Sequence, residues 1–476
     1  MMTVSNQNEE LDAPTVTTNP KDTHIKSEFD TFEKTFEIEK CAKWILDCQL
    51  GKVCLQFPDS LMPDSPDVAS RLENRLSKKV FILGDNSCTN CCIDEVTARH
   101  VNGDGIIHFG HACLSPMTSL PAFHVLPQSD IDTKAFCEKF TEYFIDKTKK
   151  ILFFYDVAYG HAIELIYKNL KSTFKNLSVT TLNCTSNVDF VNTKTSANTL
   201  PLGRNCILEN GYKIEDYDAF FLGPNCRTLN VLGTSVPVKT WYYWENDTIN
   251  ELIAVNTPWL KRRRYLVEKL KDAGIVGIVI ATLGIKGYLD VITIIKSILK
   301  QMKKKSYIIS VGKPNPAKLA NFSEVDAFVV ITCPENDIFT SRDFHKPILM
   351  PYEVDLAFNA ARTFSQRYYM DFREILPGEA NYVSFEASSN SDVSLISGGI
   401  RDFKENPTET PEMNALTTRL AGIVAISNDG ANYLLNRSWQ GLEQRLGQDK
   451  AKPAEKGRSG LPASYENEPM PRRTED

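Results

Sequence analysis

The sequence predicts an α/β protein in which one α/β unit is used three times. Three apolar, strand-like segments each begin with an aspartate and end on a cysteine: Asp104–Cys113, Asp218–Cys226 and Asp326–Cys333. Between them, helical segments alternate with further strand segments. Because alternating strands and helices form parallel sheets with right-handed crossovers, we expect small parallel sheets flanked by helices.

The first unit is expected over residues 27–147, after a polar tail, residues 1–26, that we expect to be disordered. Apolar residues at helical spacing begin the unit, and Asn102-Gly103 ends its last helix because both residues tolerate positive φ. The expected order is a helix over 29–48, strand 52–57, helix 67–76, strand 79–83, a helix from the loop 84–92 to about residue 101, and strand 106–109.

The second unit, residues 148–255, and the third, residues 256–385, repeat this alternation. For the second we expect strand 150–155, helix 161–170, strand 177–182 and strand 219–222. For the third we expect a helix through 271 with the basic run 261–264 on its exposed face, strand 275–283, helix 288–300, strand 307–311, helix 317–320 and strand 327–332. Strand 275–283 is apolar nearly throughout, as is typical of a strand covered on both faces.

Residues 386–476 form a C-terminal extension that we expect to be partly disordered. It is rich in Ser, Asn and Glu, with one short helical stretch predicted over 414–424. The final thirty residues are rich in Lys, Pro and Glu, and we expect them to be loose.

Composition limits the possible functions of the 476-residue chain. A hydrophobic fraction of 42% and a charged fraction of 24% indicate a soluble globular protein, and the length favours several domains. The net charge of −6 gives no reason to expect direct nucleic-acid binding. The chain shows neither a secretory leader nor an apolar run long enough to cross a membrane, so we expect a cytoplasmic protein with reduced cysteines.

The cysteines carry the specific chemical information. Cys88, Cys91 and Cys92 share one loop, while Cys113 and Cys333 end strands. Ligand sites of parallel sheets lie at the carboxyl ends of strands, so thiols from several units can meet at one centre. A buried cysteine is usually only a packing residue, and we weigh the two interpretations about evenly. Widely separated thiolates favour an iron–sulfur cluster over zinc, and three ligands would leave one iron open.

Other motifs are weaker. His108 and His111 could complete a zinc site with Cys113, although strand alternation directs the two rings to different faces. Cys88-Thr-Asn-Cys91 could be a thioredoxin-like redox pair, but the expected helix begins after Cys92. The sequence contains no Walker A motif and no glycine fingerprint for dinucleotides after the first strand.

Several motifs resemble those of the diphthamide synthesis family, and the resemblance covers most of residues 30–465. They are Gly84-Asp-Asn-Ser-Cys-Thr-Asn-Cys-Cys-Ile-Asp-Glu95, Ile107-His-Phe-Gly-His-Ala-Cys-Leu-Ser-Pro116, Thr332-Cys-Pro-Glu-Asn-Asp337, Lys346-Pro-Ile-Leu-Met-Pro-Tyr-Glu353, Asp371-Phe-Arg-Glu-Ile-Leu-Pro-Gly378, Arg437-Ser-Trp-Gln-Gly-Leu-Glu443 and Gly457-Arg-Ser-Gly460. The first two of these motifs resemble the second subunit of the family's heterodimer more than its catalytic sister subunit.

The resemblance implies three similar α/β domains in a pseudo-threefold arrangement and a [4Fe–4S] cluster. Its ligands would be Cys92, Cys113 and Cys333, with Cys91 as the alternative to its neighbour. In other family members a Leu-Gly-Cys segment supplies a ligand from the middle domain, whereas this chain has Arg204 after Leu-Gly. That difference argues against a complete S-adenosylmethionine site in this chain. By the same comparison, Cys206 and Cys226 are expected to be packing residues.

The implied reaction is the first step of diphthamide formation, in which a 3-amino-3-carboxypropyl group moves from S-adenosylmethionine to a histidine of elongation factor 2. The chain would be the accessory subunit that supports its catalytic sister and, with an electron-donor protein, the reduction of the sister's cluster. We expect no catalytic residue in this chain. The alternatives are a scaffold subunit with structural cysteines and, ranked last, a zinc-dependent hydrolase.

Overall fold

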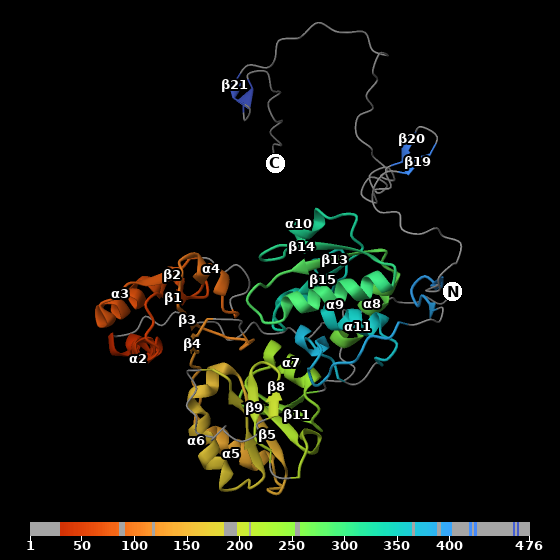
Figure 1. Ribbon diagram of the computed structural model, residues 1–476. Helices are drawn as coiled ribbons and strands as arrows, with labels where there is room; N and C mark the ends of the chain where they lie inside the picture. The colour runs from red at the N-terminus through yellow and green to blue at the C-terminus, as the bar shows by residue number, and fades with distance from the viewer. Residues whose placement is uncertain are drawn as a thin grey trace, which may run out of the picture. The chain divides into compact units, whose positions relative to one another are not determined.

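The computed structural model describes residues 29–84, 91–116, 120–184, 198–208, 211–252, 258–363, 367–387 and 392–401, with short strands within 418–425 and 460–465. The chain divides into two units, Met1–Thr408 and Glu409–Asp476. Figure 1 labels the described helices and strands. The predicted tail 1–26, Cys88 and the segment 436–443 lie outside the described residues. None of the described helices combines the length and the apolar character needed to cross a membrane.

The first sheet has four parallel strands in the order β2-β1-β3-β4, drawn in red to orange in Figure 1. Its elements are α1 (Phe29–Thr35), α2 (Ile38–Asp47), β1 (Val53–Gln56), the 3-10 helix η1 (Met62–Asp64), α3 (Ser65–Leu76), β2 (Val80–Leu83), α4 (Glu95–His100), β3 (Gly105–Phe109) and β4 (Ala122–Val125). The predicted single helix over 29–48 is two helices, because Glu37 between them adopts left-handed backbone with φ of 45°. Asn102, after α4, has φ of 53°, as predicted for the end of that helix.

The second sheet has five strands in the order β12-β11-β10-β5-β6, of which only β12 is antiparallel to its neighbour. Its elements are α5 (Thr133–Tyr143), β5 (Ile151–Tyr155), η2 (Val157–Ala162), α6 (Ile163–Lys171), β6 (Leu177–Val179), η3 (Ile214–Asp216), β10 (Asp218–Leu222), α7 (Arg227–Ser235), β11 (Trp241–Glu245) and β12 (Thr248–Leu252). A small antiparallel sheet of β7 (Thr181–Leu182), β8 (Asn198–Leu200) and β9 (Arg204–Cys206) belongs to the same part of the chain.

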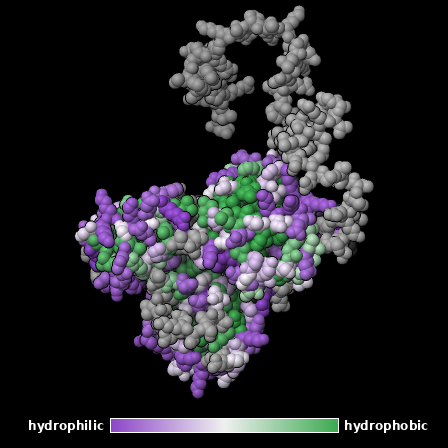
Figure 2. Space-filling view, viewed as in Figure 1, coloured by the Kyte–Doolittle hydropathy of each residue, from purple (hydrophilic) through white to green (hydrophobic). Residues whose placement is uncertain are grey.

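The third sheet has four parallel strands in the order β14-β13-β15-β16. Its elements are α8 (Pro258–Asp272), β13 (Ile275–Ile280), α9 (Tyr288–Gln301), β14 (Lys305–Ser310), α10 (Pro316–Ala320), β15 (Ala327–Ile331), η4 (Asp337–Phe339), β16 (Ile348–Leu349), α11 (Pro351–Phe358) and η5 (Phe372–Ile375). A hairpin, β17 (Asp392–Val393) with β18 (Ile400–Arg401), follows. Hydrophobic surface gathers over β13, β14 and α9 on the face shown in Figure 2. Leu289 of α9 and Ile308 of β14 are exposed.

The three sheets share one strand order. In each of them the first strand along the chain lies between the second and the third, and the fourth pairs with the third. The prediction of an α/β protein with several parallel sheets flanked by helices is therefore confirmed.

The aspartates that open the third strands have a structural role. Asp104 Oδ2 accepts hydrogen bonds of 3.0 Å from the backbone N–H groups of Gly51 and Lys52. Asp326 Oδ2 accepts equivalent bonds of 2.9 Å from Gly274 and Ile275. The aspartate thus fastens the start of a third strand to the start of the first strand beside it. In the second sheet, Asp218 instead pairs with Lys149 at 2.9 Å.

The C-terminal unit, Glu409–Asp476, differs from the prediction. Residues predicted as a helix over 414–424 include β19 (Thr418–Leu420) and β20 (Ile423–Ala425), which pair antiparallel. Periodicity in a short apolar stretch does not separate a helix from a hairpin. The remaining strands of this unit are β21 (Gly460–Leu461) and β22 (Ser464–Tyr465).

Candidate metal centre

Four cysteine thiols meet where the first and third sheets approach each other. Their ligand atoms all lie within 4.8 Å of one another: Cys91, Cys92, Cys113 and Cys333. The closest pairs of sulfurs are Cys92 with Cys113 at 3.5 Å, Cys91 with Cys333 at 3.6 Å, and the two adjacent cysteines at 3.9 Å. Cys91 is half-buried and the other three are buried. The structure thus brings together the three predicted ligands and the alternative to one of them.

The loop that carries the adjacent cysteines is held by a side chain from β1. The Gln56 amide is fully buried; its Nε2 donates to the Cys92 carbonyl at 2.8 Å, and its Oε1 accepts from the Asp94 N–H at 3.0 Å. Asp94 in turn caps α4 by accepting from the Thr97 N–H at 3.0 Å. The helix α4 therefore begins after the loop, and Asp94, not a thiol, accepts the hydrogen bond at its N-terminus.

Cys113 reaches the site just beyond the carboxyl end of β3. Its N–H donates to the Cys91 carbonyl at 3.1 Å, which ties the two loops of the first sheet together. The Ser115 Oγ lies 3.3 Å from the Cys113 sulfur. Leu114, between these two residues, adopts left-handed backbone with φ of 54°. This cysteine is therefore placed by backbone contacts and not only by packing.

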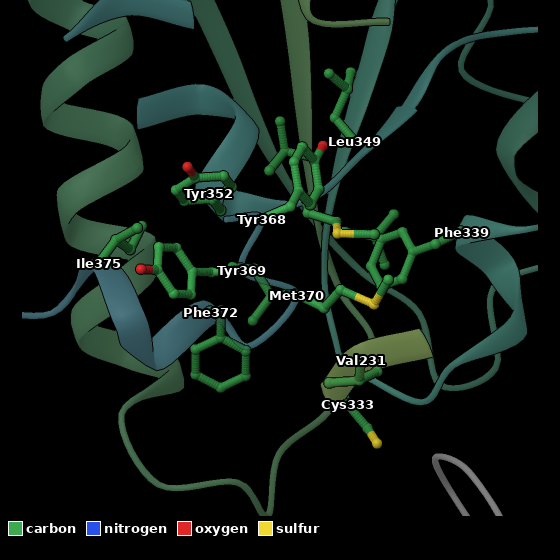
Figure 3. Close-up of a cluster of buried hydrophobic side chains, with 14 of the residues drawn as sticks. Val231, Cys333, Phe339, Leu349, Tyr352, Tyr368, Tyr369, Met370, Phe372 and Ile375 are labelled. Carbon is green, nitrogen blue, oxygen red and sulfur yellow. The ribbon is translucent and has the colours of Figure 1, made fainter. Parts of the chain in front are cut away.

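Cys333 lies two residues beyond the end of β15 and comes from the third sheet. Its sulfur accepts a hydrogen bond of 3.3 Å from the Glu335 N–H. Figure 3 shows Cys333 at the edge of a buried apolar cluster that includes Tyr368, Tyr369 and Met370, with its sulfur directed away from the tyrosines. The strand end thus presents the thiol toward the other cysteines rather than into the core.

The contacts between the thiols shift their pKa values in opposite directions. The pKa of Cys113 is well below its usual range because Cys333, Cys91 and Cys92 donate hydrogen bonds to its sulfur. The pKa of Cys92 is raised, chiefly by its contact with Cys113, and burial raises the pKa of Cys333. The site thus stabilises a thiolate at Cys113, and a metal must displace the protons of Cys92 and Cys333.

An ion pair between the first and third sheets lies beside the thiols. His111 Nε2 is 2.7 Å from Glu335 Oε2, and the Thr228 hydroxyl donates to Glu335 Oε1 at 2.6 Å. Burial lowers the pKa of His111, but the Glu335 carboxylate outweighs burial and raises it to about 10. The sequence pattern points to His111 only as a zinc ligand and does not reveal this pair, whose members are 224 residues apart.

The imidazoles of the alternative zinc site are engaged elsewhere. His108 Nε2 lies 3.1 Å from the His111 carbonyl oxygen, and His111 binds Glu335. Within the described part of the chain, the potential metal ligands that cluster are the four cysteines. The geometry therefore gives no support to a site of two histidines and Cys113.

Arg204, Cys206 and Cys226, which lie in β9 and just after β10, have other partners. Arg204 is buried and donates to the carbonyls of Leu202 at 3.0 Å and Tyr155 at 2.9 Å. The Cys226 sulfur lies 3.8 Å from Asp156 Oδ2, and burial raises the pKa of Cys206 to about 12. Neither cysteine belongs to the group of four thiols, which agrees with their interpretation as packing residues.

A set of four thiols suits soft metal centres, which are zinc or an iron–sulfur cluster. The close sulfur contacts of 3.5 to 3.9 Å are near the value of about 3.8 Å that tetrahedral zinc with Zn–S bonds of about 2.3 Å requires. An iron–sulfur cluster places iron and sulfide between its thiolates and needs them farther apart. Because the four thiols come from three separate loops, rotation of their side chains can widen the site. The donor set therefore fits both centres.

Fold and site together define an α/β protein with a group of four thiols, three of them buried, that could hold a metal. A family model described as putative diphthamide synthesis protein matches residues 57–369, and the chain belongs to this family. Similar curated proteins are named 2-(3-amino-3-carboxypropyl)histidine synthase subunit 2. The chicken protein is 35% identical over 92% of this chain and 93% of its own length; the human protein is 33% identical over 91% and 93%.

Solved structures agree in fold. Dph2 from Pyrococcus horikoshii superposes with a TM-score of 0.52 at 19% identity, over 74% of this chain and 98% of its own. A second structure of that protein, with a 4Fe-4S cluster, gives a TM-score of 0.53 at 20% identity, over 74% and 99%. The resemblance to the diphthamide synthesis family noted from sequence motifs is thus confirmed.

Proposed function

We propose that this chain is the iron–sulfur accessory subunit of a heterodimeric transferase. The enzyme would move a 3-amino-3-carboxypropyl group from S-adenosylmethionine to a histidine of elongation factor 2, the first step of diphthamide biosynthesis. The observation that carries the proposal is the buried group of four thiols in a chain whose relatives are named as subunit 2 of the histidine synthase. The 4Fe-4S cluster of the structural neighbour supports iron as the metal.

The cluster ligands in this proposal include Cys92, Cys113 and Cys333. A bound [4Fe–4S] cluster supplies one-electron chemistry that side chains alone do not provide. The chain's own residues position the thiolates: Gln56 holds the loop of Cys92, and the Glu335 N–H donates to the sulfur of Cys333. The Glu335 N–H stabilises negative charge on the Cys333 sulfur and so favours the thiolate state that metal binding needs.

The shared strand order supports a finer architecture, in which three similar domains are related by a pseudo-threefold arrangement. We propose the domain boundaries 27–147, 148–255 and 256–385, followed by the C-terminal extension 386–476. Two thiol-bearing loops then belong to the first domain and one to the third.

In this proposal the chain acts in the cytoplasm with three protein partners. They are the catalytic sister subunit, elongation factor 2 as substrate, and an electron-donor protein. This chain supports the sister subunit and the reduction of its cluster, and it carries no catalytic side chain of its own.

A second candidate is a scaffold subunit whose thiols bind structural zinc or no metal. The sulfur contacts of 3.5 to 3.9 Å favour this candidate, since they match a single tetrahedral ion without rearrangement. Metal content separates the two candidates directly.

The test is anaerobic purification of the full chain with its partner subunit, with iron, sulfide and zinc counted and visible and EPR spectra recorded. We expect iron and sulfide in cluster proportion and the broad visible absorbance of an iron–sulfur centre. Cys113→Ala and Cys333→Ala should lose iron while the heterodimer persists. Cys206→Ala, a buried cysteine outside the group, is the matched control and should keep its iron. One zinc per chain without a chromophore, or a partner that is fully active alone, would refute the proposal.

A further inference from the structure

Cys91 and Cys92 are not geometric alternatives. Although adjacent in sequence, each sulfur meets a different thiol from elsewhere in the chain: Cys91 contacts Cys333 at 3.6 Å and Cys92 contacts Cys113 at 3.5 Å. The four sulfurs therefore surround one centre, with two pairs that each join separate segments. A three-ligand site would leave one of the adjacent thiols turned away, which the structure does not show.

The backbone holds both adjacent cysteines in this orientation. The Cys91 carbonyl accepts from the Cys113 N–H at 3.1 Å, and the Cys92 carbonyl accepts from Gln56 Nε2 at 2.8 Å. These contacts hold the loop in the conformation in which both sulfurs lie within 4.8 Å of the other thiols. Half-buried Cys91 lies at the more accessible side of the group, and the other three thiols are buried.

Space beside the thiols is small. The crevice lined by Cys91, Cys92, Cys113, Ser115, His124 and Gly284 has a volume of about 10 Å³, close to the minimum for one water molecule. Pockets for small-molecule ligands are typically about 300–1,000 Å³. A crevice of this size holds neither a nucleoside nor a four-iron cluster, so the thiols must move apart when a cluster binds.

We infer that Cys91 is the fourth protein ligand, so that the cluster of this chain has no open iron. The inference rests on the proposed function and deepens it. A cluster with four thiolates has no free coordination position for S-adenosylmethionine, so its chemistry is limited to accepting one electron from the donor protein and passing one on. No bond forms or breaks at this site, and S-adenosylmethionine is bound only by the partner subunit.

The test is oxidation of the anaerobic iron-loaded protein with mild ferricyanide. An iron without a thiolate ligand leaves a four-iron cluster readily, and the product is a three-iron cluster with its own EPR signal. We expect the wild-type chain to keep its iron and Cys91→Ala to lose about one iron per cluster with that signal. Cys137→Ser, a half-buried cysteine outside the group, is the matched control and should behave as wild type.

A second measurement needs no variant. S-adenosylmethionine is added to the reduced wild-type chain without its partner, and the EPR spectrum of the cluster should not change. Three results would each overturn the inference: three-iron conversion of the wild type, wild-type behaviour of Cys91→Ala, or a spectral change on adding S-adenosylmethionine. Each would leave the proposed function standing, because the iron cluster would still be present. Absence of iron from the wild type would overturn the proposed function as well.

Discussion

Glu335 makes two contacts beside the thiols. Its carboxylate forms the ion pair with His111, and its backbone N–H donates to the sulfur of Cys333. His111 precedes Cys113 by two residues, so the ion pair joins the two strand ends that carry these thiols. The pair therefore helps to set the spacing of the thiols before any metal binds.

At the residue scale we predict that Glu335→Gln destabilises the protein by about 3 kcal/mol, the lower end of the range for breaking a buried pair, because His111 can shed its proton. Chemical denaturation at pH 7 measures this loss. The control is Glu215→Gln, which removes a solvent-exposed pair with Arg367 and should change stability by less than about 1 kcal/mol. Equal effects of the two substitutions would contradict the assigned role of the buried pair.

Local sequence identifies some residues of the site and not others. Cys113 and Cys333 stand out because each ends an apolar strand of a repeated unit, and the structure does place both thiols in the group of four. The adjacent thiol Cys91 was considered only as an alternative, because a strand pattern does not give loop orientation. The partnership of His111 and Glu335 arises from tertiary contact across 224 residues, and no local pattern encodes it.

At the element scale, the prediction that the basic run of α8 is exposed is wrong for Arg263. The run 261–264 was expected on an exposed helix face, but Arg263 is buried and its Nε donates to Glu353 Oε1 at 2.7 Å. The Tyr368 hydroxyl and the Met350 N–H also donate to this carboxylate. The charge pattern alone does not reveal that this face of α8 packs against α11, because Glu353 neutralises Arg263, the buried arginine of the run.

We predict that Glu353→Gln alone costs about 3–5 kcal/mol, because it leaves the Arg263 charge buried without a counter-charge. The double substitution Arg263→Met/Glu353→Gln should cost less than the single one, because it removes the buried guanidinium charge together with its counter-charge. Urea unfolding of both variants measures the difference. Removing an exposed pair, Lys168→Met beside Glu164, is the control and should matter by less than about 1 kcal/mol.

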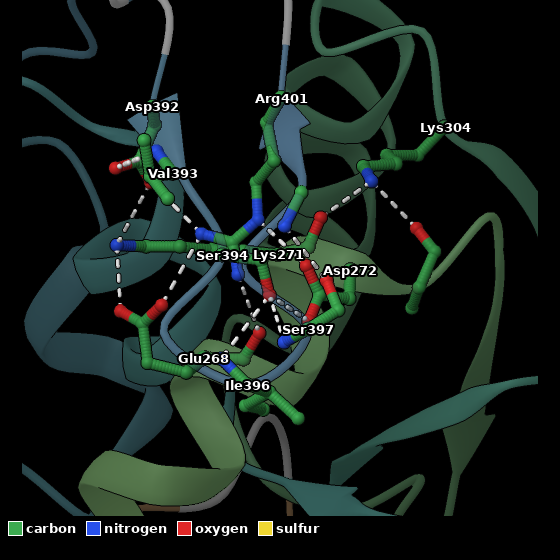
Figure 4. A network of polar contacts seen from close by, with 12 residues as sticks. Glu268, Lys271, Asp272, Lys304, Asp392, Val393, Ser394, Ile396, Ser397 and Arg401 are labelled. Atoms are coloured by element: carbon green, nitrogen blue, oxygen red, sulfur yellow. Dashed lines mark hydrogen bonds and ion pairs between the residues drawn. The ribbon is translucent and has the colours of Figure 1, made fainter.

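The hairpin of β17 and β18 is attached to the end of α8 mainly by one arginine (Figure 4). Arg401 contacts Asp272 at 2.6 Å and Asp392 at 2.9 Å, and the Ser394 hydroxyl donates to Asp272 at 2.8 Å. Burial raises the pKa of both aspartates, but hydrogen bonds from Arg401 outweigh it and lower both below the ordinary value of 3.8.

A carboxyl group whose pKa is lower in the folded protein than in the unfolded chain stabilises the fold at pH values above the unfolded-chain pKa. This stabilisation is lost as pH falls through the pKa of the folded protein. We therefore predict that the hairpin is protected from amide exchange at pH 7 and detaches as pH falls below about 4. Hydrogen exchange of residues 392–401 at a series of pH values measures this. In Arg401→Gln the segment should exchange readily at every pH; protection independent of both pH and Arg401 would contradict the argument.

The prediction of elements worked best where burial is uniform. The apolar runs of β1, β5, β13 and β15 were identified from sequence within a few residues, since their strands are wholly or almost wholly buried. The edge strands β2, β6 and β14 were predicted, but β4, β11, β12 and β16 were missed. Of these, β12 and β16 have neither a long apolar run nor clear alternation. Their place depends on the strands beside them rather than on local preference.

At the scale of the whole molecule, the thiols connect parts of the chain that are far apart in sequence. Cys91 and Cys333 are 242 residues apart, and Cys92 and Cys113 only 21. A metal that binds all of them closes a long loop between the first and third sheets, and it stabilises the folded state because the unfolded chain does not hold it. The second sheet contributes no thiol to this group.

Removal of the metal should therefore loosen one region rather than the whole fold. We predict that after chelation, amides in residues 91–94, 113–116 and 333–336 exchange at least about tenfold faster, which corresponds to about 1.4 kcal/mol of local stability. The strands β5 and β10 of the second sheet are the internal reference and should change by less than about twofold, because their fully paired, buried strands do not depend on the thiols. Hydrogen exchange with mass spectrometry on loaded and chelated protein measures both regions in one sample. Equal acceleration in the reference strands would mean that the metal supports global folding, and no acceleration at the thiol loops would mean that the four cysteines do not share a metal.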